Sequence, residues 1–129
     1  MFETLNLFRM AAAMARHAGQ RQAIVAQNVA HADTPGYVAR DIPDFRASYL
    51  AADGPAVLRA SRARHLHGQR PADALRAIAE VSDQAAPNGN QVSLETEMLK
   101  SVDAKRQHDR ALAIYRSALM LLRGSLRTN

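Results

Sequence analysis

The sequence predicts a mainly α protein, built as an elongated antiparallel pair of long N- and C-terminal helices with an irregular middle that is part β and part loop. Three observations lead to this prediction. Apolar residues recur at helical spacing near both ends of the chain, over residues 3–32 and 92–126. Residues of the turn-forming types interrupt both patterns, and residues 35–91 between them keep no regular period. A helix at each end with an irregular insert allows the chain to fold back on itself.

The N-terminal helix is predicted over residues 3–32. Leu5, Phe8, Val25 and Val29 are among its apolar positions at helical spacing. At about 1.5 Å per residue this helix is roughly 45 Å long, which is too long for a compact domain of this size. Its first half is apolar on nearly every side, and such a helix needs cover from several directions. The rest of the chain is too small to provide that cover alone.

A sharp turn is predicted where this helix ends. Thr34 precedes a proline, which disfavours the helical conformation for its backbone. Pro35 and Gly36 suit the two central positions of a type II turn. Asn28, in the last turns of the helix, either contacts a neighbouring subunit or bonds its own helix end and the following turn, and we favour the second interpretation. Tyr37 is an interface anchor or a cover for the turn, with equal weight for both.

The middle of the chain, residues 35–91, is predicted to be loop with short strands. It contains a short apolar cluster of Phe45, Tyr49 and Leu50 after Pro43. A run rich in arginine follows at residues 59–76. We treat residues 1–129 as a single domain with three parts, and the boundaries are 1–34 for the N-terminal helix, 35–91 for the middle insert and 92–129 for the C-terminal helix.

The C-terminal helix is predicted over residues 92–126, with Ser93 or Asn90 capping its start. Apolar residues in its second half step by three and four, as in a heptad seam. This seam contains Leu112, Tyr115, Leu119, Leu122 and Leu126. We expect it to pair with the N-terminal helix, and we expect the surplus apolar surface near both termini to stay exposed in a monomer. Exposed apolar patches mark interaction surfaces.

Composition and motifs argue against several classes of function. The chain has no cysteine, which removes disulfide and thiol chemistry. No stretch approaches the roughly 20 apolar residues of a transmembrane helix, and the N-terminus lacks a secretory signal. Glu95 and Glu97 point to different helix faces and cannot form a catalytic dyad, and no phosphate loop or nucleophile motif is present. His65 and His67 are the only close histidine pair, and two ligands do not make a metal site. The sequence therefore predicts no enzyme, no cofactor and no metal site.

One stretch of the chain reads NVAHADTPGY over residues 28–37 and ARDI over residues 39–42. It resembles the N-terminal signature of bacterial flagellar rod and hook proteins, and within that group it is most similar to the FlgB-type proteins of the proximal rod. The start of the C-terminal helix, from Asn90 to Met98, also resembles rod proteins. The residues that carry the motif and its turn are Asn28, Asp33, Thr34, Pro35, Gly36 and Tyr37.

This resemblance implies a rod-type domain whose terminal helices form a D0-type coiled coil. It implies a structural subunit of the proximal rod of the bacterial flagellar basal body, which assembles helically and connects the membrane ring and export gate to the rest of the axial structure for motility. The implied partners are other rod subunits, the rod adaptor protein, the membrane ring and export gate, and further copies of the chain, with neither nucleic acid nor a small-molecule substrate. The implied location is the periplasmic rod, reached by type III export without a cleaved signal peptide. We expect the assembly contacts to involve Leu5, Phe8, Val25, Val29, Leu112, Tyr115, Leu119 and Leu122.

The alternative function is a small, basic helical protein that binds nucleic acid or an anionic surface. The formal net charge of +5 and the arginine-rich run at residues 59–76 favour this alternative. The run has no interleaved aromatic residue, and no helix-turn-helix spacing is evident. Tight binding to random DNA with a steep salt dependence would distinguish this alternative from rod assembly.

Overall fold

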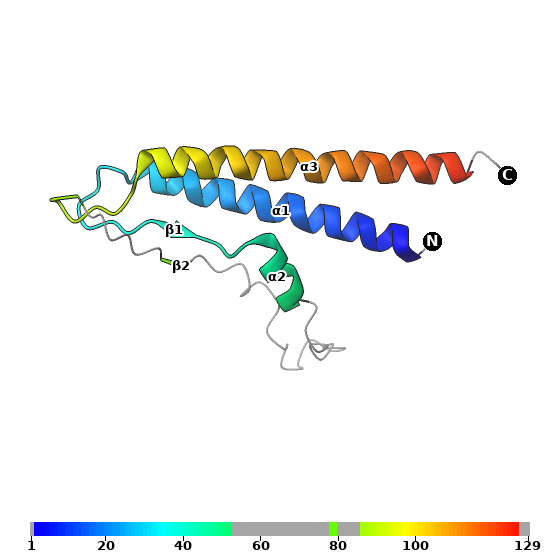
Figure 1. The fold of residues 1–129 in the computed structure, drawn as a ribbon, viewed down its shortest axis with the longest axis horizontal. Coiled ribbons are helices and arrows are strands. Elements are labelled where there is room, and N and C mark those ends of the chain that lie inside the picture. Colours follow the sequence, from blue (N-terminus) through cyan, green and yellow to red (C-terminus); the bar gives the residue numbers. More distant parts are fainter. Residues whose placement is uncertain (1, 53–77, 80–85, 127–129) are drawn as a thin grey trace, which may run out of the picture.

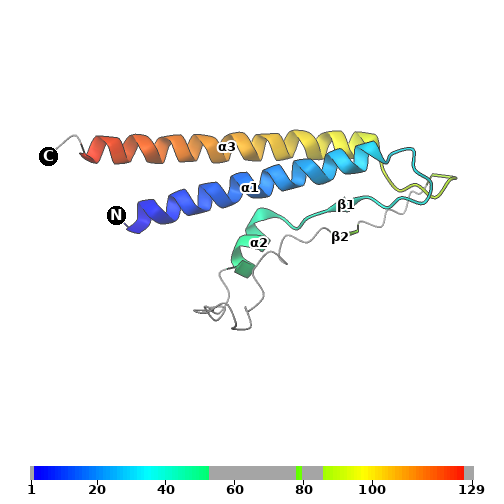
Figure 2. The ribbon, with the colours of Figure 1, turned by 180° about the vertical axis from the view of Figure 1, so that it is seen from behind.

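The computed structural model describes residues 2–52, 78–79 and 86–126. The elements follow in the order α1 (Phe2–Ala30), β1 (Arg40–Asp41), α2 (Phe45–Ala52), β2 (Ile78–Ala79) and α3 (Leu94–Leu126). Figures 1 and 2 show α1 and α3 side by side and antiparallel. The start of α1 and the end of α3 lie at the same end of the molecule. We call this the terminal end, and the opposite end, where α1 stops and α3 starts, the loop end. The predicted elongated, mainly α antiparallel pair is confirmed.

The contact between α1 and α3 is made mainly by small side chains. Seven of the buried positions on the two helices recur in steps of seven residues. They are Ala11, Ala18 and Val25 on α1, and Glu97, Ala104, Ala111 and Ala118 on α3. A seven-residue repeat keeps one stripe of each helix facing its partner, and alanine lets the two backbones approach closely because its side chain is a single methyl group. The helix pair is therefore joined along an alanine seam.

The predicted seam through Leu112, Tyr115, Leu119, Leu122 and Leu126 is correct only in part. Tyr115 meets Phe8 of α1, but the fully buried positions of this half of α3 are alanines. Leu112 and Leu119 each directly follow a buried alanine, and Leu112 and Tyr115 remain 37% and 40% exposed. The two stripes share the same seven-residue period, so periodicity alone does not choose between them. Close approach of the backbones favours the alanine stripe and moves the larger side chains to its flanks.

The turn after α1 has the predicted form. The amide of Tyr37 donates to the carbonyl of Thr34 over 3.3 Å, and Gly36 between them has a φ of 71°. A positive φ at the third residue with this closing hydrogen bond is typical of a type II turn. The helix itself ends at Ala30, two residues before the predicted limit. The prediction of a sharp turn at residues 35 and 36 is confirmed.

A second turn before α3 packs directly against the first. Gly89 has a φ of 77°, and the Gly36 amide donates to the carbonyl of Asn88 over 3.2 Å. A Cβ built on Gly89 would lie 3.6 Å from the Gly36 Cα. The amide of Gln91 adds a 2.9 Å bond to the Tyr37 carbonyl. These backbone contacts hold the two turns against each other at the loop end.

The described residues 37–52, with β2 paired to β1, form an arm along α1. β1 pairs antiparallel with β2, with Arg40 opposite Ala79 and Asp41 opposite Ile78. In Figures 1 and 2, α1 lies between α3 and this arm, which continues into α2. The short predicted strands are confirmed, but the loop predicted around Phe45 and Tyr49 is a helix. These two rings, four residues apart, lie on one side of it with centroids separated by 5.4 Å.

Two sequence features lie outside the described residues. These are the arginine-rich run at 59–76 and the histidine pair His65 and His67. Binding of nucleic acid or an anionic surface therefore stays a prediction from composition. In the part of the chain that the structure describes, neither long helix has an 18-residue window apolar enough for a bilayer span.

Candidate assembly interface

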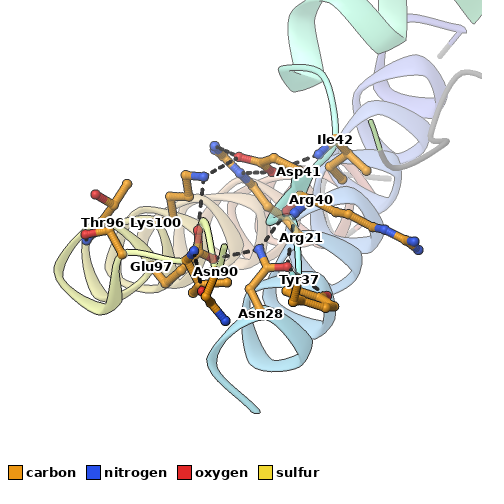
Figure 3. Close-up of polar contacts among 12 residues, drawn as sticks. Arg21, Asn28, Tyr37, Arg40, Asp41, Ile42, Asn90, Thr96, Glu97 and Lys100 are labelled. Carbon is orange, nitrogen blue, oxygen red and sulfur yellow. Dashed lines mark hydrogen bonds and ion pairs between the residues drawn. The ribbon is translucent and has the colours of Figure 1, made fainter. Parts of the chain in front are cut away.

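Asn28 lies at the centre of a buried polar cluster at the loop end (Figure 3). Its side chain has no exposed surface. Its amide nitrogen donates to Glu97 Oε2 over 2.9 Å and to the Arg40 carbonyl over 2.7 Å. Its oxygen accepts from the Arg40 amide over 3.1 Å and from the Tyr37 hydroxyl over 3.3 Å. These four bonds use the full capacity of the amide group, and they join α1 to β1 and α3.

This geometry differs from both interpretations of Asn28 offered by the sequence. The side chain is enclosed within its own chain, so it presents no surface to a neighbouring subunit. The favoured interpretation holds only for the bond from the Tyr37 hydroxyl, because Tyr37 belongs to the following turn. The other partners lie on β1 and α3. The Tyr37 ring covers the turn by stacking on His31, with centroids 4.6 Å apart and an interplanar angle of 11°.

A chain of ion pairs continues the cluster from Glu97 to Arg21. Arg21 donates two hydrogen bonds to Asp41, over 3.0 Å from Nε and 2.7 Å from Nη2. Lys100 Nζ lies 3.7 Å from Asp41 Oδ2 and 3.1 Å from Glu97 Oε1. The cluster thus alternates two cations with two carboxylates and has no net charge. It links the middle of α1 to the arm and to the first turns of α3.

The charges of the Arg21 and Asp41 pair are stabilised in the folded chain. Burial acts to raise the pKa of Asp41, but hydrogen bonds from Arg21 and the Ile42 amide, with the charges of Arg21 and Lys100, outweigh it and lower that pKa below its ordinary value. The hydrogen bond to Asp41 raises the pKa of Arg21 above its already high ordinary value. Both groups are therefore ionised at neutral pH, and the pair is a fixed joint between α1 and β1.

Asn90 connects the two turns. It is 4% exposed, and its amide nitrogen donates to the carbonyls of His31 and Thr34 over 3.0 Å and 2.7 Å. Its oxygen accepts from the Val92 amide over 2.8 Å. Of the two predicted caps, Ser93 is the N-cap of α3. Its Oγ lies 3.5 Å from the Thr96 amide, and its carbonyl accepts a hydrogen bond from the Glu97 amide. Asn90 instead stabilises the turn after α1.

The cluster has the properties of a structural joint. Its charges are paired with one another, and its carboxylates are turned toward cations and amides of the same chain. Glu95 is exposed and Glu97 is buried, so the two carboxylates lie on different faces as predicted. Over residues 2–52, 78–79 and 86–126, no group of three or more His, Cys, Asp or Glu side chains is placed to hold a metal ion.

The side chains expected to make assembly contacts lie mostly on the flanks of the alanine seam, toward the terminal end. Leu5 is 55% exposed, and Val29, which lies at the loop end of α1, is 41% exposed. Phe8 of α1 and Tyr115 of α3 meet edge to face, with centroids 5.1 Å apart. Leu119 and Leu122 are half-buried. Val25 is different: at 2% exposure it belongs to the seam inside the chain.

Sequence reasoning missed His17, which docks α2 on α1. His17 is 2% exposed, its Nε2 donates to the Pro43 carbonyl over 2.8 Å, and its ring meets Phe45 edge to face at 5.6 Å. The apolar cluster after Pro43 is the only sequence signal for this contact. Sequence reasoning also missed the ion pair of Arg21 and Asp41, because nothing in their spacing of twenty residues marks them as partners.

Comparison with known proteins gives one consistent result. The chain is similar to the flagellar basal body rod protein FlgB of Salmonella typhimurium (strain LT2), with 32% identity over 108 residues that cover 78% of each chain. It is 35% identical over 104 residues to FlgB of Yersinia enterocolitica, with 74% of each chain covered. It is 29% identical over 122 residues to FlgB of Agrobacterium fabrum, covering 89% of this chain and 88% of the relative. No protein-family model matches the chain.

Proposed function

The chain belongs to the FlgB family of flagellar basal body rod proteins, and we propose that it is a structural subunit of the bacterial flagellar basal-body rod that assembles through its terminal helices. The observation that carries the assembly part of this proposal is the exposed apolar surface at the terminal end. Leu5, Met120 and Leu121 are 55%, 71% and 66% exposed on two helices that have no other described element beside them there. Exposed apolar side chains in such number favour a partner surface.

Contacts between two different surfaces of successive copies produce an open, helical assembly when the rotation between copies does not close into a ring. The elongated helix pair suits this arrangement, because its length lies along one axis. The expected contacts are those of Leu5, Phe8, Val29, Leu112, Tyr115, Leu119 and Leu122, with Val25 supporting them from within the seam. We propose no role for the buried polar cluster in contacting neighbours, since it lies inside the chain.

We further propose the position of this subunit in the flagellum. It lies in the proximal, periplasmic part of the rod and connects the membrane ring and export gate, through the rod adaptor protein, to the other rod subunits. It reaches this position by the flagellar type III export route. The family membership supports this placement, and the proposal requires no nucleic acid, cofactor or small-molecule substrate.

Replacing Leu119 by Asp tests the assembly surface. Leu119 is half-buried on the flank of the seam at the terminal end, where a carboxylate would oppose apolar contact with a neighbour. We expect the variant to be synthesised but absent from isolated basal bodies, and the cells to be non-motile. Gln20→Asp is the matched control, because Gln20 is exposed in the middle of α1, and it should incorporate normally. Swimming by Leu119→Asp cells would contradict the interface assignment, and absence of the unmodified chain from basal bodies would overturn the proposed function.

A further inference from the structure

Arginine dominates the charge of the helix pair toward the terminal end. The chain contains no acidic residue between Glu3 and Asp33, and none follows Asp109. Within these two stretches, each long helix carries two arginines spaced by seven residues. They are Arg9 and Arg16, which we call the α1 arginine pair, and Arg116 and Arg123, which we call the α3 arginine pair. All four side chains are exposed, and no ion pair between described residues involves them.

The two arginine pairs lie on opposite sides of the helix pair. Arg9, Arg16 and Arg116 each precede a buried alanine of the seam by two positions. Two positions turn a side chain by about 200° round a helix, so the α1 arginine pair faces away from α3 and the α3 arginine pair faces away from α1. The contact of Phe8 with Tyr115 brings the residues that follow them, 9 and 116, to the same level. Exposed cations therefore flank the terminal end on both sides.

Each arginine pair shares its helix face with an exposed apolar side chain. Leu5 precedes Arg9 by four positions and is 55% exposed. Met120 lies between the two arginines of the α3 pair, four positions after one and three before the other, and is 71% exposed. Residues three or four apart are neighbours on one face of a helix. A complementary surface therefore offers carboxylates beside apolar side chains.

The charge and its placement select the kind of partner that fits these two faces. A second copy of the chain carries the same formal net charge of +5, and like charges oppose it as the occupant. A lipid surface is flat on the scale of two helices, so it would meet the cations of one side and leave those of the other side unpaired. A protein with acidic walls meets both sides at once and also covers the apolar side chains.

We propose that the terminal end docks between acidic, partly apolar surfaces of a protein different from this chain, with carboxylates opposite both arginine pairs. This inference rests on the proposed function and adds to it the chemistry of the partner. Complementary charges across an interface steer association and select partners. Because the arginines are exposed, salt screens their attraction, and binding should weaken as the salt concentration rises.

Two model peptides test this charge complementarity with the purified, full-length chain. Both peptides are helices of three heptads with leucine at the a and d positions. One carries glutamate at the flanking e and g positions, and the other carries glutamine there. We expect fluorescence anisotropy at about 0.05 M salt to show at least about tenfold tighter binding of the glutamate peptide, and this preference to shrink at about 0.5 M salt. Equal binding of the two peptides would overturn the inference.

Arginine variants locate the preference on the chain. Arg116→Gln with Arg123→Gln should reduce the preference for the glutamate peptide at least about threefold, and the same change in both arginine pairs should abolish it. The control is Arg46→Gln with Arg106→Gln, which removes two exposed arginines away from the terminal end and should keep the preference. Circular dichroism checks that every variant retains its helices. An equal loss in the control would overturn the inference.

Other anions provide a second check on the kind of partner. The probes are vesicles that contain phosphatidylglycerol and random duplex DNA, each compared with the glutamate peptide at the same salt concentration. Binding of either probe that exceeds binding of the peptide, and that disappears when both arginine pairs are changed to glutamine, would assign the arginines to lipid or nucleic acid. That result would overturn the inference.

Cross-linking in isolated basal bodies separates this inference from the proposed function. The full chain carries the photoreactive residue benzoylphenylalanine in place of Met120, and mass spectrometry identifies the attached peptide. An acidic segment of a different protein, together with the preference for the glutamate peptide, supports the inference. Attachment to a second copy, to lipid or to a segment without carboxylates overturns it and leaves the rod subunit assignment intact. A natural chain that is missing from basal bodies overturns the proposed function, and the inference falls with it.

Discussion

Replacing Asn28 by Asp would test whether the polar cluster holds the loop end together. The amide nitrogen of Asn28 donates to Glu97 Oε2 over 2.9 Å and to the Arg40 carbonyl over 2.7 Å. In the variant, a carboxylate oxygen would face these two acceptors in place of a donor. Asn28 and Glu97 are 0% and 1% exposed, so water cannot replace the lost donor without opening the contact between α1 and α3.

The expected cost follows from this geometry. Two unit charges about 3 Å apart repel by about 5 kcal/mol at an effective dielectric constant of about 20. Two lost hydrogen bonds add about 1 kcal/mol each. Lys100, 3.1 Å from Glu97 Oε1, offsets part of the repulsion, and the carboxylates move apart. We therefore expect Asn28→Asp to lower the free energy of unfolding by about 3–5 kcal/mol at pH 7, in the range for an unpaired buried charge.

Urea unfolding followed by circular dichroism at 222 nm measures this effect across a double-mutant cycle. Adding Glu97→Gln to Asn28→Asp removes the like charge and restores an amide donor, so the pair should recover about 2–3 kcal/mol relative to the sum of the single changes. Gln27→Glu introduces the same charge at the adjacent exposed position and should change stability by less than about 0.5 kcal/mol. Additive behaviour in the cycle, or equal losses for Asn28→Asp and Gln27→Glu, would refute the reasoning.

Three further predictions concern the joint, the turns and the terminal end. Asp41→Asn should lower the free energy of unfolding by about 1–3 kcal/mol at pH 7. Because the folded pKa of Asp41 is lowered, the stabilisation is present above the unfolded pKa near 3.9 and disappears as pH falls through the folded pKa. A difference in stability between the variant and the natural chain that persists at pH 2 would contradict this prediction. Gly36→Ala should lower the free energy of unfolding by about 1–2 kcal/mol, because the φ of Gly36 is 71°. Gly19→Ala should raise it by up to about 1 kcal/mol, since Gly19 lies inside α1 with open space around it. If urea unfolding gave changes of the same sign for both variants, this account would be wrong. Amides of residues 3–15 should exchange faster in the isolated chain than those of residues 20–30, and uniform protection in hydrogen exchange measured by mass spectrometry would show that the terminal end needs no neighbour.

The parts of this fold that sequence reasoning predicted correctly depend on local chemistry. The two long periodic segments predicted all four ends of α1 and α3 to within two residues. The turn at Pro35 and Gly36 follows from the restricted φ of proline and the freedom of glycine. The helix α2 was missed because the eight residues Phe45–Ala52 are too few to show a clear helical period.

The parts that sequence reasoning could not predict depend on which surfaces meet. Leu112 and Ala111 lie on neighbouring stripes of α3 that share one seven-residue period. Only the distance between the backbones of α1 and α3 decides which stripe is buried. Asn28 and Glu97 are 69 positions apart, and nothing local marks either as buried.

The polar cluster solves a problem that the alanine seam creates. Alanines at 104, 111 and 118 are equivalent partners for α1 when α3 slides by seven residues, so the seam by itself fits more than one register. A slide of one heptad would carry Glu97 away from Asn28 and leave a buried carboxylate without its amide donor. Such a group costs several kcal/mol, whereas the alanine contacts change little. We infer that the cluster sets the register of the helix pair, which is the best-attested use of buried polar groups. Register in turn decides how far Met120 and Leu121 project at the terminal end, so the joint at one end of the molecule controls the surface offered at the other.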